Sequence, residues 1–503
     1  MKELKKMEAF TMVELIAIIV ILVLIVIVAL PNLLGTRERQ IEREFNNFLN
    51  NLFIAAENHL TNDRDLLELL NYHNRLCITI GELREEGLIS GTATNPRDDV
   101  DVEDYHFVII RVKDDGSFEY DYIIDGSDCL PTGTLVFNAL SNLPIRNNQI
   151  ESIETRNRIE VDISTPGNWR DVSVEQNNSV IAWWEPGEEP DLYKVYIGSN
   201  GMVIAHSNTG GSLFSNLTNA THLDLTHLDT SNVTRMSSMF ALTGVSSIEF
   251  GPNFITDNVT SMSTMFFIMP NLTEIRTPDG INVINWDTKN VTDMGGMFYE
   301  TRLSHIEFGS NFVTDNVTSI NGMFWGMRNL TEIRTPAGIN VINWDTRNVT
   351  NMRLMFESTR LSHIEFGSNF VTNNVTNMGM MFGNMSNLTE IRTPAGTNVI
   401  NWDTRNVTTM EFMFSSIRLS SLEFGSNFVT NNVTNMEMMF SGMRNLNNTQ
   451  GLNIRHFNFN NVTNRDSMFS QTPTNARLTV NQAGNTWLNN NGFSAWNNRV
   501  VVP

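Results

Sequence analysis

The triplet Asn-Val-Thr recurs nine times in this chain of 503 residues, and this recurrence constrains the fold more than any other feature. The intervals alternate between 26 and 32 residues until a last interval of 29, and a phenylalanine follows eight residues after each Asn. A fixed period of this length is the signature of a solenoid, in which each repeat contacts only its neighbours. Residues 226–470 are therefore predicted to form a stack of similar turns. The triplets begin at Asn232, Asn258, Asn290, Asn316, Asn348, Asn374, Asn406, Asn432 and Asn461.

One repeat unit predicts a short helix and a short strand. Four apolar residues recur at helical spacing after the triplet at Asn258, and either Asn258 or Thr260 is available to cap the helix. Leu272–Arg276 then mixes apolar and polar residues as a short strand does. We expect an α/β solenoid of the leucine-rich-repeat-like kind, with one short helix and one short strand in each turn. The four apolar residues are Met262, Met265, Phe266 and Met269.

The motif LDTSNVTRMSSMF at Leu228–Phe240 resembles the repeat signature of the BspA-type leucine-rich repeat surface proteins. Residues 149–225 resemble the lead-in of that family, and residues 471–503 are expected to close the stack as a polar cap. The resemblance implies a cell-surface protein that binds host matrix proteins or other bacteria.

The repeats come in pairs of 58 residues, and the charge beside the predicted strand alternates within each pair. Neighbouring parallel strands lie about 4.8 Å apart, so the alternation predicts a ladder of opposite charges along the array. We interpret the paired repeat as a device for stability in preference to a ligand site. The alternating residues are Glu249, Arg276, Glu307, Arg334, Glu365, Arg392, Glu423 and Arg455.

Other regular columns also have structural interpretations. Trp286, Trp344 and Trp402 suggest a sugar-binding row, but phenylalanines stand at the same offset in the other units, so an aromatic core is favoured. The recurrent methionines are expected to fill the core, and the asparagines to bond adjacent turns.

The longer units carry a turn sequence that packing does not require. Its Pro and Gly predict a tight turn, and three such turns would line one edge of the array. If the array binds something repetitive, these turns are the candidate ligand-facing residues. They comprise Thr277, Pro278, Gly280, Thr335, Pro336, Gly338, Thr393, Pro394 and Gly396.

The N-terminal stretch FTMVELIAIIVILVLIVIVALPN is apolar enough to cross a membrane, yet it contains Glu14. Residues 10–31 would span roughly 30 Å as a helix, about the thickness of a bilayer core. A charge costs about 3 kcal/mol at the centre of such a helix and less near its end, so Glu14 needs a partner. The basic residues of Met1–Lys6 predict a single pass with the N-terminus in the cytoplasm and the chain after Pro31 outside the cytoplasmic membrane.

These features resemble the type IV pilin family more than a signal peptide, which would end in a small-residue cleavage site. Residues 1–9 match the leader, Phe10 the first mature residue and Pro31 the helix-kinking proline, while Ala9 stands where the family nearly always has Gly. The resemblance implies cleavage by prepilin peptidase and N-methylation of Phe10. It also implies that Glu14 pairs with the terminal amine of another pilin-like subunit. An unprocessed membrane anchor is the alternative.

Residues 32–130 resemble a small α+β pilin head, and residues 131–148 are predicted to be a linker. The apolar stripe from Phe45 to Ala56 predicts a helix in the head, and residues 104–125 predict a hairpin. In an exported chain Cys77 and Cys129 could pair, which would contribute roughly 4 kcal/mol, or they could be two independent buried thiols.

The sequence shows no catalytic constellation, no cofactor motif and no metal-ligand spacing. Its net charge of −21 and its lack of clustered Lys and Arg argue against a nucleic-acid partner. Two functional hypotheses follow. The first is a membrane-anchored, pilin-like surface protein that displays a repeat array for adhesion or protein–protein binding. The second is a minor pilin or pseudopilin, a structural part of a type IV pilus, secretion or DNA-uptake machine.

The pilin resemblance predicts the mass of the mature protein. Intact-mass spectrometry of the protein from membranes should show loss of Met1–Ala9 and one added methyl group on Phe10. Recovery of the intact precursor from mature cells would contradict the pilin hypothesis and favour the unprocessed anchor.

Overall fold

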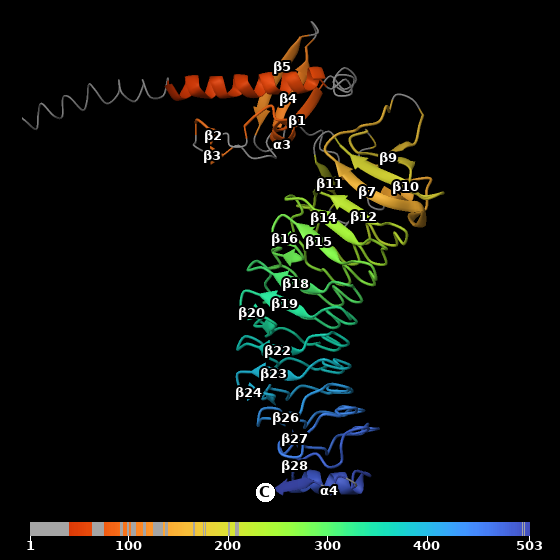
Figure 1. Ribbon diagram of the computed structural model, residues 1–503, viewed down its shortest axis with the longest axis vertical. Helices are drawn as coiled ribbons and strands as arrows, with labels where there is room; N and C mark the ends of the chain where they lie inside the picture. The colour runs from red at the N-terminus through yellow and green to blue at the C-terminus, as the bar shows by residue number, and fades with distance from the viewer. Residues whose placement is uncertain are drawn as a thin grey trace, which may run out of the picture. The chain divides into compact units, whose positions relative to one another are not determined.

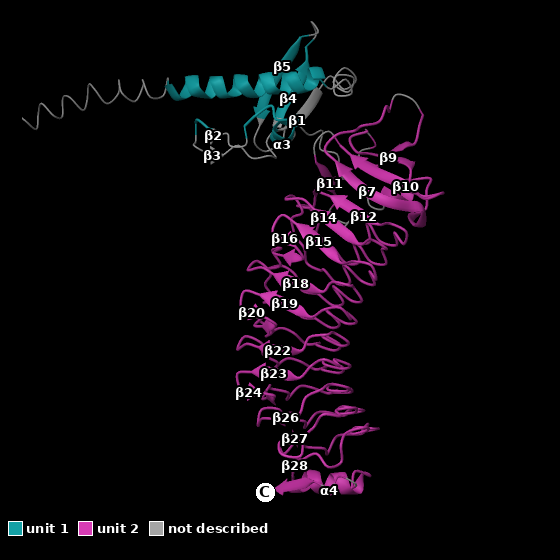
Figure 2. Cartoon of the chain, in the orientation of Figure 1, with its two compact units in different colours: residues 1–131 teal, residues 132–503 magenta. Residues whose placement is uncertain are grey.

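The structure is a computed structural model in which the chain divides into two compact units, residues 1–131 (unit 1) and residues 132–503 (unit 2), as Figure 2 shows. The structure describes residues 40–62, 75–90, 94–97, 100–101, 107–113, 117–123, 134–135, 139–163, 166–174, 176, 178–199, 202–206, 211–494, 496 and 498–503.

Several residues named from the sequence lie outside the described part of the chain. They are Ala9, Phe10, Glu14, Pro31 and Cys129, together with the side chain of Cys77. Within the described ranges, no helix is long and apolar enough to cross a membrane. The leader, the membrane helix of residues 10–31 and the disulfide therefore stay predictions.

Unit 1 packs one helix against a three-stranded antiparallel sheet (Figure 1). Helix 40–62 carries Leu52, Ala56 and Leu60 at intervals of four residues, so they share one face, and all three are buried. Val108 and Ile110 of the central strand belong to the same core. The predicted hairpin is present as the antiparallel pair β4–β5. The elements are β1 (Arg75–Thr79), α3 (Ile80–Glu85), β4 (Phe107–Val112), β5 (Phe118–Ile123) and the short pair β2 (Thr94–Asn95) and β3 (Val100–Asp101).

Unit 2 begins with a sheet that changes from antiparallel to parallel pairing. Strands β8, β9 and β10 pair antiparallel, whereas β10 and the first array strand β12 both pair parallel with β7. Leu135, Leu140 and Leu143, from the stretch predicted to be a linker, belong to the same hydrophobic core as the array. The elements are β6 (Thr134–Leu135), η1 (Ala139–Asn142), η2 (Asn147–Gln149), β7 (Ile150–Arg156), β8 (Trp169–Asp171), β9 (Ile181–Pro186), β10 (Tyr193–Gly198) and β11 (Val203–Ala205).

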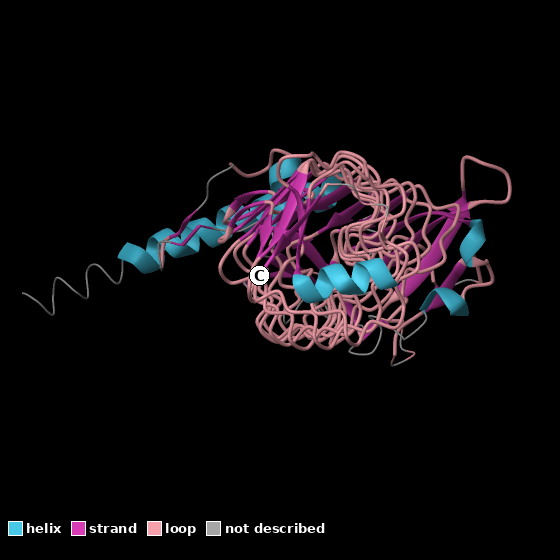
Figure 3. Ribbon diagram, turned by 90° about the horizontal axis from the view of Figure 1, so that it is seen from below, coloured by secondary structure: helices cyan, strands magenta, loops and turns pink. Residues whose placement is uncertain are grey.

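From β12 (His222–Leu225) onward the chain is a parallel β-solenoid whose turns follow in chain order (Figure 1), and seen from below their loops superpose (Figure 3). In each 32-residue unit the strand turns back into a hairpin, as β15 does into β16, and β17 then pairs parallel with β18 of the next turn. The remaining strands are β13 (Leu228–Asp229), β14 (Ser247–Phe250), β15 (Glu274–Thr277), β16 (Gly280–Ile281), β17 (Val283–Ile284), β18 (His305–Phe308), β19 (Glu332–Thr335), β20 (Gly338–Ile339), β21 (Val341–Ile342), β22 (His363–Phe366), β23 (Glu390–Thr393), β24 (Gly396–Thr397), β25 (Val399–Ile400), β26 (Ser421–Phe424), β27 (Gly451–Asn453), β28 (Leu478–Asn481) and β29 (Arg499–Val502).

The predicted helix in each turn is wrong: residues 211–481, all of which the structure describes, contain no α-helix. Six and ten residues after each Asn of a triplet, the backbone is left-handed, as at Ser238 and Leu242, and this conformation interrupts a right-handed helix. The N–H groups bond the next turn instead. Those of Ser238, Phe240 and Leu242 donate to Ser263, Met265 and Phe267 carbonyls at 3.0, 3.0 and 2.8 Å.

Each residue of the Asn-Val-Thr triplet has a separate structural role. The Asn348 amide donates to the Asp315 carbonyl of the preceding turn at 2.6 Å, and the Thr350 hydroxyl donates to the Thr318 carbonyl at 3.2 Å. Val349, between them, is fully buried. The same two bonds recur in every triplet from Asn258 to Asn461, which confirms the predicted asparagine ladder.

The core of the array is a column of aromatic rings flanked by methionines. The phenylalanine of each turn stacks on its counterparts at centroid distances of 5.4 to 6.2 Å, from Phe240 to Phe469. The methionines beside it, such as Met352 and Met355, are fully buried, as predicted.

The C-terminal residues cover the last ring of this column. Helix α4 (Gln482–Asn490) begins after Asn481, whose side chain accepts from the Gly484 N–H at 2.6 Å. Trp496 packs edge-to-face on Phe469 with ring centroids 5.2 Å apart. Figure 3 shows α4 lying across this end of the stack. The apolar end of a solenoid is thereby kept from water.

The charge ladder is real but discontinuous. Glu307 pairs in register with Arg334, and their charged groups approach to 3.8 Å. Glu365, however, lies beside Val341, because the hairpin separates it from Arg334. In the last step Asn453, not Arg455, lies in register with Glu423, but Arg455 still reaches the Glu423 carboxylate at 3.0 Å. The array therefore holds separate Glu–Arg pairs, not one alternating column.

The separate pairs predict an asymmetric response to charge reversal. Arg334→Glu should lower the free energy of unfolding by about 0.5–1 kcal/mol, since the pair is half-exposed. Adding Glu307→Arg should restore part of the stability, since Glu332, the other partner of Arg334, would still face a like charge. Adding Glu365→Arg should lower it further by placing Arg against Arg392. Thermal denaturation at low salt measures these differences. Recovery with Glu365→Arg would support a continuous column instead.

A buried threonine lies two residues before each triplet except the last, where Phe459 takes its place, and it predicts a second effect. The Thr346 hydroxyl, only 1% exposed, donates to the Val371 carbonyl at 2.6 Å and accepts from the Val371 N–H at 2.8 Å. Thr346→Val should cost about 1–3 kcal/mol, because the N–H and the carbonyl of Val371 both lose the Thr346 hydroxyl as their partner. The exposed Thr350→Val is the matched control and should cost about 0.5 kcal/mol. Denaturant unfolding checks both, and equal costs would contradict the argument.

Candidate functional site

The predicted Pro–Gly turns form the tips of hairpins that two side chains hold in place. The Thr335 hydroxyl donates to the Val341 carbonyl at 2.7 Å and accepts from the Ala337 N–H at 3.2 Å. Asn340, 2% exposed and in the left-handed region, bonds both backbone groups of Ile333 at 2.6 and 2.8 Å. The other long units repeat these bonds through Asn282 and Asn398. The tight-turn prediction is confirmed.

Two equivalent clefts open beside these turns. One, of about 530 Å³, has Thr335–Ala337 in its wall, and the other, of about 380 Å³, has Thr393–Ala395. The loop of the preceding short unit forms part of each lining. Twelve of the thirteen lining positions carry the same residue type in both clefts, and the exception is Asp315 in the first against Asn373 in the second. The clefts are therefore a repeated feature of the 58-residue unit.

The aromatic core contributes to the lining of each cleft. Trp402 is 7% exposed and packs on Phe370, with ring centroids 5.5 Å apart, and edge-to-face on Phe366. Trp344 occupies the equivalent position in the first cleft, 5.8 Å from Phe312. The tryptophans belong to the core, as predicted. The indole N–H of Trp402 is nevertheless buried without an acceptor in the described structure.

Other polar groups of the lining also lack protein partners. Asn401 uses its side-chain oxygen to accept from the Asn427 N–H at 2.9 Å, which leaves its NH₂ group without an acceptor among the described residues. The hydroxyl of Ser368 is exposed and makes no hydrogen bond to this part of the chain. Asn343 and Ser310 repeat this arrangement in the first cleft. Each cleft thus presents unused donors over an apolar floor.

A charged pair lies at each cleft. Asp403 accepts from Arg405 Nε at 2.9 Å and from its backbone N–H at 3.2 Å, and Asp345 pairs in the same way with Arg347. The hydrogen bond from Arg405 holds the pKa of the Asp403 carboxyl below its ordinary value, and Arg347 does the same for Asp345. Both carboxylates therefore stay ionised at neutral pH and are already partnered.

The sequence identified part of this site and missed the rest. The predicted residues Thr335, Pro336, Thr393 and Pro394 do line the clefts, whereas Gly338 and Gly396 are absent from the lining and serve the hairpin with left-handed backbones. Thr277, Pro278 and Gly280 form the equivalent hairpin of the first long unit, where Asp279 replaces alanine and accepts from Asn285 at 3.5 Å. The sequence named Trp344 and Trp402 but assigned them to the core. The residues it missed are the Asn and Asp on either side of each tryptophan and the Ser-Asn pairs of the short units. Their signal was their recurrence at 58 residues.

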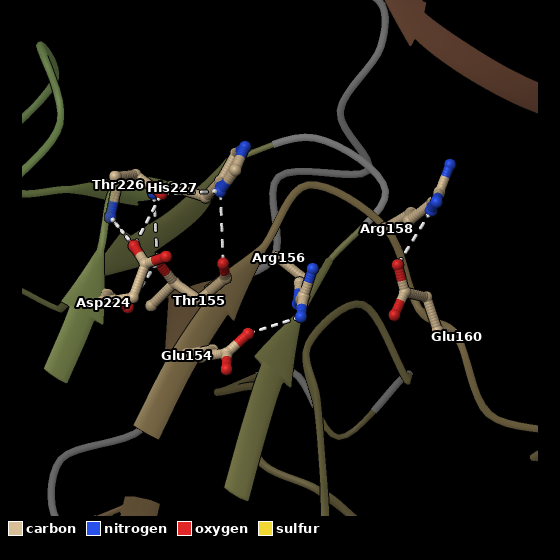
Figure 4. Close-up of polar contacts among 8 residues, drawn as sticks. All are labelled: Glu154, Thr155, Arg156, Arg158, Glu160, Asp224, Thr226 and His227. Atoms are coloured by element: carbon tan, nitrogen blue, oxygen red, sulfur yellow. Dashed lines mark hydrogen bonds and ion pairs between the residues drawn. The ribbon is translucent and has the colours of Figure 1, made fainter. Parts of the chain in front are cut away.

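A different polar network lies where the lead-in meets the array (Figure 4). The Thr155 hydroxyl donates to the Asp224 carbonyl at 3.3 Å and accepts from the His227 N–H at 3.0 Å. The ring of His227 lies 3.1 Å from the Thr155 carbonyl and from the Thr226 hydroxyl. These bonds join β7 to the first turn of the array, so we assign the network a role in stabilising this junction and not in binding a ligand.

The described residues contain no group of three or more His, Cys, Asp or Glu side chains that could hold a metal ion. The fold and the repeated clefts define a parallel β-solenoid repeat protein with two equivalent surface clefts.

The family model described as "Mycoplasma protein of unknown function, DUF285" matches residues 211–335, 272–392, 331–418 and 384–498. Together these matches cover more than half of the chain, which therefore belongs to this family. A comparison with curated proteins found no match. Among solved structures, the chain matches one titled "The Crystal structure of Pneumococcal vaccine antigen PcpA" with 10% identity and a TM-score of 0.32, over 82% of this chain and 99% of that chain.

Proposed function

We propose that this chain is a membrane-anchored, pilin-like surface protein whose repeat array binds partners outside the cell, for adhesion or protein–protein contact. The observation that carries the proposal is the repetition of one cleft, with the same lining, in successive double units. A solenoid core needs its inward residues to repeat, but it does not need surface donors such as those of Ser368 and Asn401 to repeat unpaired. A row of equivalent sites suits a partner met at several points at once.

The anchoring half of the proposal rests on the sequence. The apolar run of residues 10–31, the basic Met1–Lys6 and Glu14 support a single pass through the cytoplasmic membrane with the array outside. Its partners would then be prepilin peptidase, other pilin-like subunits and the membrane itself. The array would face host matrix proteins or other bacteria.

The second candidate is a minor pilin or pseudopilin whose array contacts only other parts of a pilus, secretion or DNA-uptake machine. One observation favours it: unit 1 packs helix 40–62 against the antiparallel strands β1, β4 and β5. A helix laid on a small antiparallel sheet is the arrangement expected of a pilin head. The two candidates differ in what the array binds.

A soluble fragment of residues 132–503 separates them. It should fold alone, since it keeps Leu135, Leu140 and both covered ends of the core. An adhesin fragment should bind host matrix or partner bacteria and compete with whole cells that display the protein. Plate binding and cell-adhesion counts measure this.

Matched variants locate the binding surface. Ala337→Trp with Ala395→Trp narrows both clefts and should reduce competition at least tenfold, because two of the repeated sites are lost together. The control Ile339→Thr changes an exposed hairpin residue that lines neither cleft and stands where the third hairpin has Thr397. If the folded fragment binds neither host matrix nor partner bacteria but binds pilin-like subunits, the second candidate is supported instead.

A further inference from the structure

We propose that a row of five exposed arginines on the array binds a linear, sulfated glycan. This inference rests on the proposed function, because it names a class of surface polymer that an adhesive array would recognise. The arginines stand twelve residues after the Asn of a triplet, in five of six successive turns, and the remaining turn carries Ser386. They are Arg302, Arg328, Arg360, Arg418 and Arg444.

The solenoid brings together arginines that stand 26 to 58 residues apart in the chain. The N–H groups of Arg302, Arg360 and Arg418 each donate to a leucine carbonyl of the preceding turn at 3.0 Å, so neighbouring turns are in direct contact here. The stacked core phenylalanines, four residues before each of these positions, lie 5.6 to 6.2 Å apart from turn to turn. The row therefore extends for roughly 30 Å along the array.

The five guanidinium groups have no carboxylate partner among the described residues, and all five side chains are exposed. The arginines of the adjoining strands do form ion pairs, as Arg334 does with Glu307 at 3.8 Å, and the later strands repeat this pairing. Of the row, Arg444 bonds an uncharged side chain, that of Gln471. The positive charges of the row are thus available to a ligand.

Stability does not account for the row. Like charges on neighbouring turns repel one another, which disfavours the folded array. Gly244, Pro270 and Ser386 occupy the same position in other turns, so the fold does not require arginine there. The chain as a whole carries a net charge of −21, yet this one column is positive. An anionic partner would offset the repulsion and gain from every arginine that it contacts.

The surroundings of the row suit a hydrated polymer. Exposed serines and asparagines stand one or two residues after the arginines and Ser386, and none of the strongly exposed apolar side chains of the described residues lies in these segments. A protein partner would be expected to bury an apolar centre. A guanidinium group instead offers parallel N–H donors to an oxyanion such as a sulfate, and Ser and Asn can bond sugar hydroxyls. These neighbours are Ser304, Asn329, Ser362, Asn387, Ser420 and Asn445.

The row is narrow, which argues against double-stranded DNA and an anionic membrane. Acidic residues stand on both sides of it: Glu357 precedes Arg360 by three residues, and Glu365 follows Arg360 by five. A wide anionic surface would bring its own charges against these carboxylates, and like charges repel. A single linear chain can contact the arginines without covering the acidic residues beside them.

A single-stranded nucleic acid is the closest competitor in shape. Its bases bind by stacking on free aromatic faces. The partly exposed rings nearest to the row are those of Phe267, Tyr299 and Trp325, and they stack on one another with centroids 4.7 and 4.3 Å apart. Their facing surfaces are therefore occupied, and the row offers charge and hydrogen bonds without a stacking platform. This combination favours the sulfated glycan.

The test uses full-length protein in a non-ionic detergent. Isothermal titration with heparin fragments of four and twelve sugars should show that the longer fragment binds at least tenfold more tightly, because only it reaches along the whole row. Raising the salt from about 50 to about 200 mM should weaken the binding at least tenfold, since several ion pairs form together. Desulfated heparin, single-stranded DNA and poly-L-glutamate are the competing probes and should bind at least tenfold more weakly.

Variants taken from the repeat itself assign the binding to the row. Arg328→Ser with Arg444→Ser reproduces the segment Met-Ser-Asn-Leu that stands at residues 385–388, and should weaken binding of the longer fragment at least tenfold. Ser386→Arg fills the gap in the row and should strengthen binding about three- to tenfold.

A matched control removes the same number of positive charges elsewhere. Arg276 and Lys289 are exposed and pair with Glu274 at 2.8 Å and with Asp287 at 2.7 Å, away from the row. Arg276→Ser with Lys289→Ser should therefore change the affinity for heparin less than threefold. Circular dichroism of each variant checks that the fold is intact.

Three outcomes would overturn the proposal: no heparin binding at low salt, heparin binding that the row variants do not change, or equal binding of single-stranded DNA or poly-L-glutamate. If the fragment of residues 132–503 still competes for adhesion in any of these cases, the proposed function stands and only the ligand assignment fails. If heparin binds through the row but the fragment does not compete for adhesion, the ligand assignment stands and the proposed function fails.

Discussion

In each turn of the array from Asn258 onward, an asparagine and a threonine bond backbone carbonyls of the preceding turn, while the valine between them enters the core. The backbone of the next segment donates its alternate N–H groups to the following turn. Every turn therefore depends on a neighbour on each side, and the two ends need other partners. Thr155 of the lead-in supplies them at one end, and Trp496 covers the core at the other.

The same dependence explains which parts of the fold the sequence could predict. The repeat, the buried columns and the asparagine ladder follow from period and residue type alone. The absence of a helix could not be predicted in this way. Met262, Met265 and Phe266 have helical spacing, yet they lie in a segment with two left-handed residues. Glycine would have signalled those positions, but most turns place other residues there, such as Leu354. Hydrogen bonds to the next turn compensate for this backbone strain, and no local pattern reveals them.

The candidate site was predictable only at its projecting edge. Thr335 and Pro336 were identified because a Pro–Gly turn has no role in a packed column. The groups inside the cleft were assigned to the core or to ladders, and Trp402 does belong to the core. Its unpaired N–H depends on what surrounds it in three dimensions. The charge column failed for a related reason: the hairpin after Arg334 inserts a strand between charges that are adjacent in the repeat alignment.

The alternation of short and long units accounts for the clefts themselves. If every turn carried a hairpin, a second hairpin tip would occupy the space beside each one. The short unit has no hairpin, so its Gly-Ser-Asn loop leaves the gap that Pro394 and Asn401 border. Gly367 is required there, because a Cβ atom would lie 2.1 Å from the Asn343 side-chain oxygen. The 58-residue period therefore sets the spacing of the surface clefts as well as the pairing of charges. A ligand whose own repeat matches this period would bind more tightly with each double unit that it spans.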